Sequence, residues 1–161
     1  MELASAIIGG VLAAVCAVPF VLITQGRKKR EKKMLQSLIT LADQHDCKIS
    51  EHEFCSDFTI GIDKTKHFVF FIKKTKTKET LQYVDLNAIQ SCKVNNIGRT
   101  FRNKDGQHRE IERLELSFTP KAKDLGTINF EFYDAEINMQ LSGELQAIQK
   151  WSKIVDLQFK A

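Results

Sequence analysis

Residues 58–73 read FTIGIDKTKHFVFFIK and contain two β-strand patterns separated by a polar turn. In residues 58–63, phenylalanine and two isoleucines alternate with threonine, glycine and aspartate, which predicts a strand with one buried face. Residues 63–66 (DKTK) predict the turn. Residues 67–73 carry apolar side chains at consecutive positions, so both faces of this second strand should be buried. The pair therefore predicts the inner part of an antiparallel sheet.

The two-residue period continues downstream of this pair. Further strands are expected at residues 81–86, 89–94, 110–119 and 128–134. A bend is expected at residues 85–88, and Pro120 should end a strand because proline cannot donate to a ladder. Residues 95–109 (NNIGRTFRNKDGQHR) are polar and predict a long loop or a flexible hairpin around Asp105-Gly106. We expect six or seven antiparallel strands.

Amphipathic helices are expected on both sides of the strands. Upstream, apolar residues recur at three- and four-residue steps from Met34 to Ala42, in a helix ending near His45–Asp46. This helix could dock on the domain or lie in a lipid interface. Downstream, a helix should begin near Ser142–Gly143 and place Leu145, Ile148, Trp151 and Val155 on one face. We expect the following residues to form the structural core with it: Phe118, Phe130, Phe132 and Trp151.

Short antiparallel strands followed by one helix with a buried tryptophan resemble the pleckstrin-homology-like (PH-like) fold. The resemblance rests on YVDLNAI (Tyr83–Ile89), the LELSF…INFEFYD pair (Leu114–Asp134) and GELQAIQKW (Gly143–Trp151). It covers residues 48–161 and looks closest to bacterial membrane-anchored members, many of them of uncharacterised function. It implies an α+β, mainly β domain in which a bent antiparallel sheet forms a partly open barrel capped by the C-terminal helix.

The same resemblance bears on lipid binding. Members of the family that bind phosphoinositides place basic residues between their first two strands. The corresponding turn here, Asp63–Lys66, has two lysines but begins with an acid, and a denser basic run follows one hairpin later. A shared fold does not establish a shared ligand.

The N-terminal segment predicts a membrane anchor. Leu3–Ile23 (LASAIIGGVLAAVCAVPFVLI) is uncharged, and its roughly 21 residues would rise about 31 Å as a helix, matching a hydrocarbon core of about 30 Å. A cleaved signal or a lipoprotein signal with Cys16 as its modified residue would need the basic residues before the apolar run, but here they follow it. The basic residues expected to contact lipid head groups are Arg27, Lys28, Lys29, Arg30, Lys32 and Lys33.

This charge order sets the expected topology and domains. Basic residues resist translocation, so the N-terminus should lie outside and the rest in the cytoplasm, in a single-pass inner or plasma membrane protein. The expected division is a transmembrane anchor at 1–26, a basic juxtamembrane segment with the amphipathic helix at 27–47, and the PH-like domain at 48–161. Three cysteines outside the anchor, at positions 47, 55 and 92, fit reduced thiols in a cytoplasm.

Charge balance argues against a nucleic-acid partner. Residues 34–161 keep 18 of the 24 basic residues and 18 of the 20 acidic residues, so this part of the chain is neutral. A nucleic-acid-binding domain is expected to carry a basic surplus. The excess positive charge lies at the membrane edge instead.

Candidate metal and catalytic residues are few. His45, Cys47, His52 and Cys55 lie within HDCKISEHEFC, but their spacing fits no zinc template, so we expect no metal ligands and no cofactor. The chain has no nucleophile-elbow serine, glycine-rich phosphate loop or HExxH motif, so we expect no catalytic residues and no enzymatic activity. A small metal-binding or enzymatic domain remains the third alternative.

Two basic segments are candidate contact surfaces for lipid or for a protein partner. They comprise Lys73, Lys74, Lys76 and Lys78 in the first and Arg99, Phe101, Arg102 and Lys104 in the second. The first could equally be a solvated turn, and Phe101 could pack its own loop down. Our leading hypothesis is a membrane-tethered, non-catalytic binding or scaffolding module with an unknown protein partner. The alternative is an anionic-lipid sensor that uses the basic loops.

Overall fold

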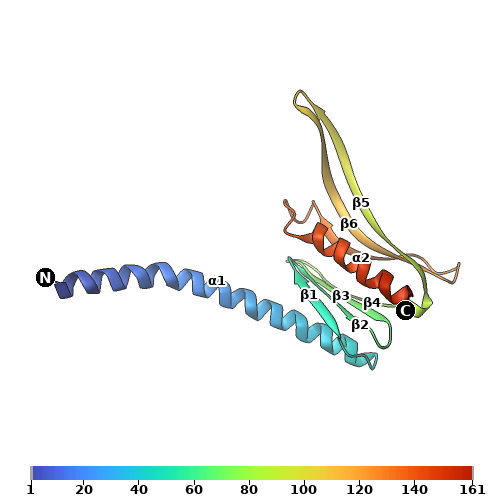
Figure 1. The fold of residues 1–161 in the computed structure, drawn as a ribbon, viewed down its shortest axis with the longest axis horizontal. Helices are drawn as coiled ribbons and strands as arrows, with labels where there is room; N and C mark the ends of the chain where they lie inside the picture. The colour runs from blue at the N-terminus through green and yellow to red at the C-terminus, as the bar shows by residue number, and fades with distance from the viewer. Residues whose placement is uncertain (1, 161) are drawn as a thin grey trace. The chain divides into compact units, whose positions relative to one another are not determined.

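The computed structural model of the protein describes residues 2–160, with the side chains of residues 2, 3, 16, 20, 21 and 160 left aside. Ala161 and the side chain of Cys16, both used in the sequence interpretation, therefore lie outside the described part. The elements are α1 (Glu2–Gln44), β1 (Glu51–Cys55), β2 (Phe58–Asp63), β3 (Phe68–Lys74), β4 (Glu79–Asp85), the 3-10 turn η1 (Leu86–Ala88), β5 (Ile89–Asn103), β6 (Gly106–Pro120), β7 (Ile128–Asp134) and α2 (Glu144–Lys160). The prediction of a long apolar N-terminal helix, antiparallel strands and a C-terminal helix is confirmed (Figure 1).

The chain divides into two compact units, Met1–Gln36 and Ser37–Ala161. The first unit is the larger part of α1, and α1 runs through the basic segment without a break, so the expected amphipathic helix is the end of this one helix. By length and composition alone, α1 could cross a membrane, and no part of its most apolar stretch is buried. Arg27 pairs with Glu31 one helical turn later, at 3.2 Å.

The second unit contains two antiparallel sheets. The first has the order β1-β2-β3-β4 and the second the order β5-β6-β7. β3 lies inside the first sheet, as its apolar sequence predicts. Strand β1 was not expected from the sequence, because EHEFC has only a weak alternation of apolar and polar residues.

Aromatic side chains join the two sheets across a shared core. The ring of Phe71 on β3 stacks on Phe130 of β7 at 4.9 Å, and Phe58 on β2 lies 4.5 Å from Phe132. Helix α2 adds fully buried side chains to this core, among them Trp151. The indole Nε1 of Trp151 donates a hydrogen bond of 2.7 Å to Glu53 on β1. The helix is therefore tied to the first sheet as well as packed against the core.

The outer face of the first sheet is also covered. All six residues of β2 are buried, so the expectation of one exposed face was wrong. The cause is the end of α1, where Leu38 and Ala42 are buried within the second unit. A Cβ added at Gly61 would lie 2.7 Å from the Leu38 side chain, so glycine leaves the space that this helix occupies. Residues 37–44 are thus docked on the sheet.

The most exposed element of the second unit is a two-stranded ribbon. β5 and β6 pair as far as Asn103 and Gly106, whereas β7 pairs with β6 only as far as Arg113. Residues 98–111, called the ribbon below, therefore continue beyond the three-stranded part of the sheet (Figure 1). At about 3.4 Å per residue, its strand from Gly98 to Asn103 spans about 17 Å. The expected long loop is therefore mostly paired strand, with its turn at Lys104-Asp105, one residue before the predicted Asp105-Gly106.

Candidate functional site

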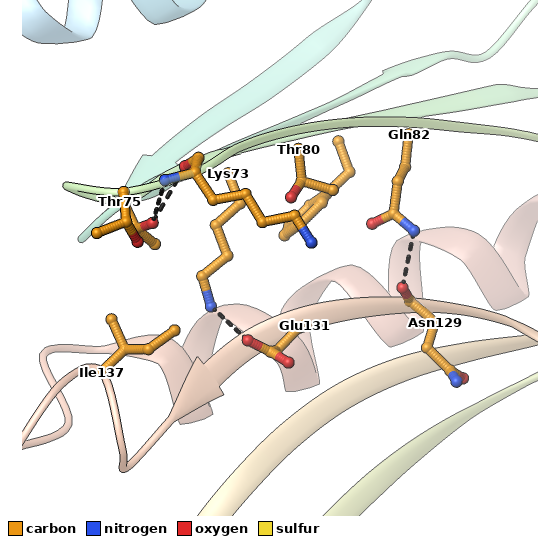
Figure 2. A pocket seen from close by; sticks show the side chains of 10 residues that line it. Lys73, Thr75, Thr80, Gln82, Asn129, Glu131 and Ile137 are labelled. Carbon is orange, nitrogen blue, oxygen red and sulfur yellow. Dashed lines mark hydrogen bonds and ion pairs between the residues drawn. The ribbon is translucent and has the colours of Figure 1, made fainter.

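A hollow opens where the two sheets are not joined. β4 and β7 are the edges of their sheets, and no backbone pairing between them exists among the described residues. The hollow between them, called the seam hollow, has a volume of about 330 Å³. Its lining residues, all drawn as sticks in Figure 2, are Phe71, Lys73, Thr75, Thr77, Lys78, Thr80, Gln82, Asn129, Glu131 and Ile137. Polar side chains dominate this lining.

Two side-chain contacts cross the seam hollow. Lys73 Nζ donates to Glu131 Oε1 at 3.0 Å, and Gln82 Nε2 donates to the backbone oxygen of Asn129 at 3.1 Å (Figure 2). Lys73 is only 5% exposed because it lies within β3 on the same face as Phe71. The expectation that Lys73 belongs to an exposed basic loop was therefore wrong. Its ammonium group pairs with Glu131 and so joins the two sheets.

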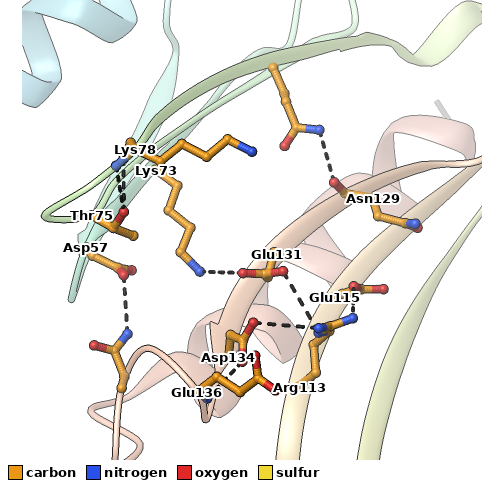
Figure 3. Close-up of polar contacts among 12 residues, drawn as sticks. Asp57, Lys73, Thr75, Lys78, Arg113, Glu115, Asn129, Glu131, Asp134 and Glu136 are labelled. Carbon is orange, nitrogen blue, oxygen red and sulfur yellow. Dashed lines mark hydrogen bonds and ion pairs between the residues drawn. The ribbon is translucent and has the colours of Figure 1, made fainter.

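Glu131 also takes part in a wider charge network. Arg113 on β6 lies 3.9 Å from Glu131, 3.7 Å from Glu115 and 3.6 Å from Asp134 (Figure 3). These distances are longer than direct hydrogen bonds. One guanidinium thus lies within ion-pair distance of three carboxylates and offsets part of their negative charge.

The remaining lysines of the first basic segment surround a tight turn. The backbone N–H of Thr75 donates to the oxygen of Lys78 at 2.8 Å, and the Lys78 N–H donates to Thr75 Oγ1 at 3.1 Å. Lys74, Lys76 and Lys78 are exposed. The Lys78 side chain extends over the seam hollow (Figure 3) and makes no ion pair within residues 2–160. This turn is solvated on one side and borders the hollow on the other.

A second hollow lies on the outer face of the second sheet, at the base of the ribbon. Its volume is also about 330 Å³, and its lining comprises Ile97, Arg99, Glu112, Arg113, Asp134, Ala135 and Glu136. Arg99 forms an ion pair with Glu112 inside it. The hollow therefore places the two exposed residues Ile97 and Arg99 of β5 beside an acidic patch of the same chain.

The ribbon gathers three of the four residues of the second basic segment on its β5 strand. Side chains alternate along a strand, so Ile97, Arg99 and Phe101 share the outer face, while Arg102 points to the other. Phe101 is 45% exposed, so it does not pack its loop down as the alternative interpretation supposed. Lys104 stands in the turn.

The four metal-ligand candidates do not converge. Cys47 donates its thiol to the backbone oxygen of His45 at 3.3 Å, and the His45 ring lies 4.0 Å from Tyr83. Cys55 instead lies near α2, with its sulfur 3.9 Å from the Ser142 oxygen. Burial first, and then nearby Glu144, raises the Cys55 pKa to about 11. Within residues 2–160, no three side chains of the metal-binding types come together.

Sequence reasoning named Lys73 and Lys78 but missed four other polar residues of the seam hollow, Thr80, Gln82, Asn129 and Glu131. Side chains alternate along a strand, so Thr80 and Gln82 lie on the same face of β4 as Val84, which faces the core. Lys73 likewise lies on the same face of β3 as Phe71. Polar residues at inward-facing positions were the available signal. No known family model, curated protein or solved structure gives a significant match to the chain.

Proposed function

We propose that this chain is a membrane-tethered, non-catalytic binding module that recruits a protein partner through its second unit. The observation that carries the proposal is the ribbon, an exposed strand pair whose β5 edge pairs with no strand in the described part of the chain. Unpaired strand edges are templates for partner strands, and proteins that do not use them usually keep them short or covered. β5 is fifteen residues long and contains no proline, so it is a long edge.

The tether is supported by the N-terminal half of α1. Its uncharged stretch is long enough to cross a bilayer, and the basic residues from Arg27 to Lys33 follow it directly. We propose a single pass with the N-terminus outside and the binding unit in the cytoplasm, because basic residues remain on the cytoplasmic side. The same residues would contact anionic head groups, at about 1 kcal/mol each.

We further propose that the second unit is a PH-like domain. A four-stranded sheet and a three-stranded sheet, packed face to face with one C-terminal helix on their core, support this assignment. The seam between β4 and β7 would then be the opening of the partly open barrel. A non-catalytic role is supported by the lining of the two hollows, which pairs lysine or arginine with carboxylates and brings no serine or cysteine nucleophile to a base.

Site-specific photo-crosslinking in cells tests the binding function with the whole chain. A photoreactive amino acid at position 101 should yield one discrete crosslinked protein, because this side chain projects from the ribbon. The matched position is Leu125, which is 60% exposed in the loop between β6 and β7 and should give none. Specific crosslinks from neither position, together with no protein that co-purifies with the detergent-solubilised chain, would contradict a recruiting role.

A reporter fusion tests the orientation separately. A reporter that is active only in the cytoplasm should work when fused after the C-terminal residue. A reporter that needs an oxidising compartment should fail at the same site. The reverse pattern would reject the topology, and with it the interpretation of the cysteines as reduced thiols.

Anionic-lipid sensing is the second candidate function. It is favoured by three exposed basic side chains, Lys78, Arg102 and Lys104, which form no ion pair with any residue from 2 to 160. A fluorophore at position 104 of the full chain, reconstituted in nanodiscs, should then be quenched by spin-labelled lipid in anionic but not in zwitterionic bilayers. The difference should shrink above about 0.15 M salt, where the Debye length falls to about 8 Å. Equal quenching in both bilayers would argue against lipid sensing.

A further inference from the structure

Along the ribbon, the outer edge of β5 has backbone groups that could pair with another strand. In an antiparallel pair, every second residue turns its backbone N–H and C=O away from its neighbour strand. From Asn95 to Asn103, all residues of β5 except Gly98 are exposed. The Asn96 backbone oxygen accepts a hydrogen bond from Arg109 at 3.1 Å, and no strand pairs with this edge among the described residues. Gly98 lies at a bulge, where an added Cβ would be 2.5 Å from the Glu110 oxygen. The bulge therefore requires glycine, and the pairing of β5 with β6 continues beyond it with the register shifted by one residue.

The side chains of this edge are apolar, uncharged polar or basic, and none is acidic. On the outer face, Ile97 and Phe101 are each 45% exposed. Arg99 lies between them and pairs with Glu112, so a partner carboxylate would share or replace this exposed ion pair. On the opposite face, Arg102 is exposed and makes no ion pair within the described residues. The neighbouring strand β6 carries three glutamates, so the charge of one sign is particular to β5.

We propose that the β5 edge of the ribbon binds an extended, acidic segment of a partner protein, added as an antiparallel strand. This inference rests on the proposed binding function and names the partner's chemistry. Backbone groups of the segment would satisfy the free edge, and its carboxylates would face Arg99 and Arg102. Its apolar side chains would cover Ile97 and Phe101 as cross-strand pairs.

Two other occupants fit this edge less well. A bilayer core offers no hydrogen-bond partners, so inserting an unpaired strand edge into it leaves backbone groups unsatisfied. If the β5 strands of two copies paired, Lys93, Arg99 and Arg102 of one copy would lie near the same three cations of the other, because β5 has no carboxylate. Like charges placed opposite each other destabilise a sheet.

The register predicts the order of residues in the bound segment. Read from its N-terminus, it opposes Arg102, Phe101, Thr100, Arg99, Gly98 and Ile97 in that order. The preferred pattern is therefore acidic, apolar, polar, acidic, any residue, apolar. A fluorescein-labelled peptide with the core Glu-Val-Thr-Glu-Ser-Val serves as the probe. A control peptide has lysine in place of both glutamates.

The test uses the full chain in nanodiscs of zwitterionic lipid. Fluorescence anisotropy should detect binding of the acidic peptide and little binding of the lysine peptide. Arg102→Glu should weaken binding about fivefold or more, since it replaces an exposed attraction with a repulsion. Lys123→Glu changes net charge equally in the exposed loop between β6 and β7, and it should have no effect. A peptide with lysine only at its first position should recover affinity for the Arg102→Glu chain.

Amide hydrogen exchange decides whether a strand is added. Peptide binding should slow exchange at alternate residues of β5 between positions 95 and 103. Phe101→Ser should weaken binding, whereas the matched Leu125→Ser should not, because Leu125 is exposed in a loop outside the ribbon. Binding without amide protection would mean charge attraction alone and would overturn the proposal.

Other outcomes overturn the proposal in distinct ways. Protection that grows with protein concentration in the absence of peptide would identify a second copy as the occupant. Protection induced by anionic nanodiscs alone would identify the bilayer. No binding of the acidic peptide above the lysine control would reject the edge. A crosslinked partner found from position 101 or elsewhere would then still support the binding function, so the two failures are distinguishable.

Discussion

Replacing Trp151 tests how α2 holds the two sheets together. Trp151 is fully buried in the core, and its only polar atom donates to Glu53 at 2.7 Å. Trp151→Ala removes one of the largest buried side chains, which typically costs about 3–5 kcal/mol. A domain is usually stable by about 5–15 kcal/mol, so the variant should be partly unfolded or unfold much earlier in urea. Glu53 should add little to this cost, because it is 30% exposed and keeps Lys150 at 3.5 Å.

Trp151→Phe separates the ring from the hydrogen bond. It keeps most of the apolar packing and loses the N–H donor, so the cost should be about 1–2 kcal/mol. Lys150→Ala is the matched control, since it breaks only an exposed ion pair worth less than about 1 kcal/mol. Urea unfolding of the full chain in mild detergent, followed by far-UV circular dichroism, measures all three variants.

The intrinsic emission of the unmodified chain adds a direct check, because Trp151 is the only tryptophan. Emission should be blue-shifted and resistant to aqueous quenchers. If emission resembled tryptophan in water and Trp151→Ala cost less than about 1 kcal/mol, α2 would not pack on the core as described.

Three further predictions concern the sheet and its thiols. Gly61→Val should cost about 1–3 kcal/mol in urea unfolding, because its side chain would collide with Leu38; a neutral result would mean that residues 37–44 are not docked there. Burial alone would raise the Asp63 pKa, but backbone N–H donors, including that of Lys48 at 2.8 Å, outweigh it and lower the pKa. Asp63 therefore stabilises the fold above its unfolded pKa of about 3.9 and loses this effect as pH falls through the lower folded value. The difference in free energy of unfolding between the unmodified chain and Asp63→Asn should consequently become smaller in acid; a larger difference would contradict the lowered pKa. Burial raises the Cys92 pKa to about 12, so site-resolved mass spectrometry should show alkylation near pH 8 only after unfolding.

Much of the fold follows from local patterns that the sequence displays openly. The alternation of apolar and polar residues in 58–63 and 128–134 predicts β2 and β7, and the helical period around Trp151 predicts α2. The ribbon was harder to predict, because a polar strand pair without a buried face has no hydrophobic period. Its pairing depends on a continuing ladder from the buried part of β5 and β6, which is a tertiary cause.

The candidate site was less predictable because it depends on which strands become edges. Lysines at 73, 74, 76 and 78 form one segment in sequence, yet the alternation along β3 buries Lys73 and exposes Lys74. Lys76 and Lys78 lie in the turn between β3 and β4 and are exposed. The sequence left two alternatives for Phe101, packing against its own loop or exposure to solvent, and the paired ribbon leaves it exposed. Glu131 gave no signal in the sequence, since its role depends on a partner 58 residues away.

The pair formed by the buried Lys73 and the partly exposed Glu131 explains why the two sheets share a core without closing into one continuous sheet. The aromatic rings of β3 and β7 press the sheets together at Phe71 and Phe130, but the next inward residue on β3 is a lysine. A buried cation is costly unless a carboxylate and hydrogen bonds satisfy it, so Lys73 must hold Glu131 at the seam. The side chains that fill the gap keep β4 and β7 apart, and Gln82 reaches the Asn129 oxygen in place of a strand hydrogen bond. Polar residues at inward positions thus set where the apolar core ends and where the seam hollow begins.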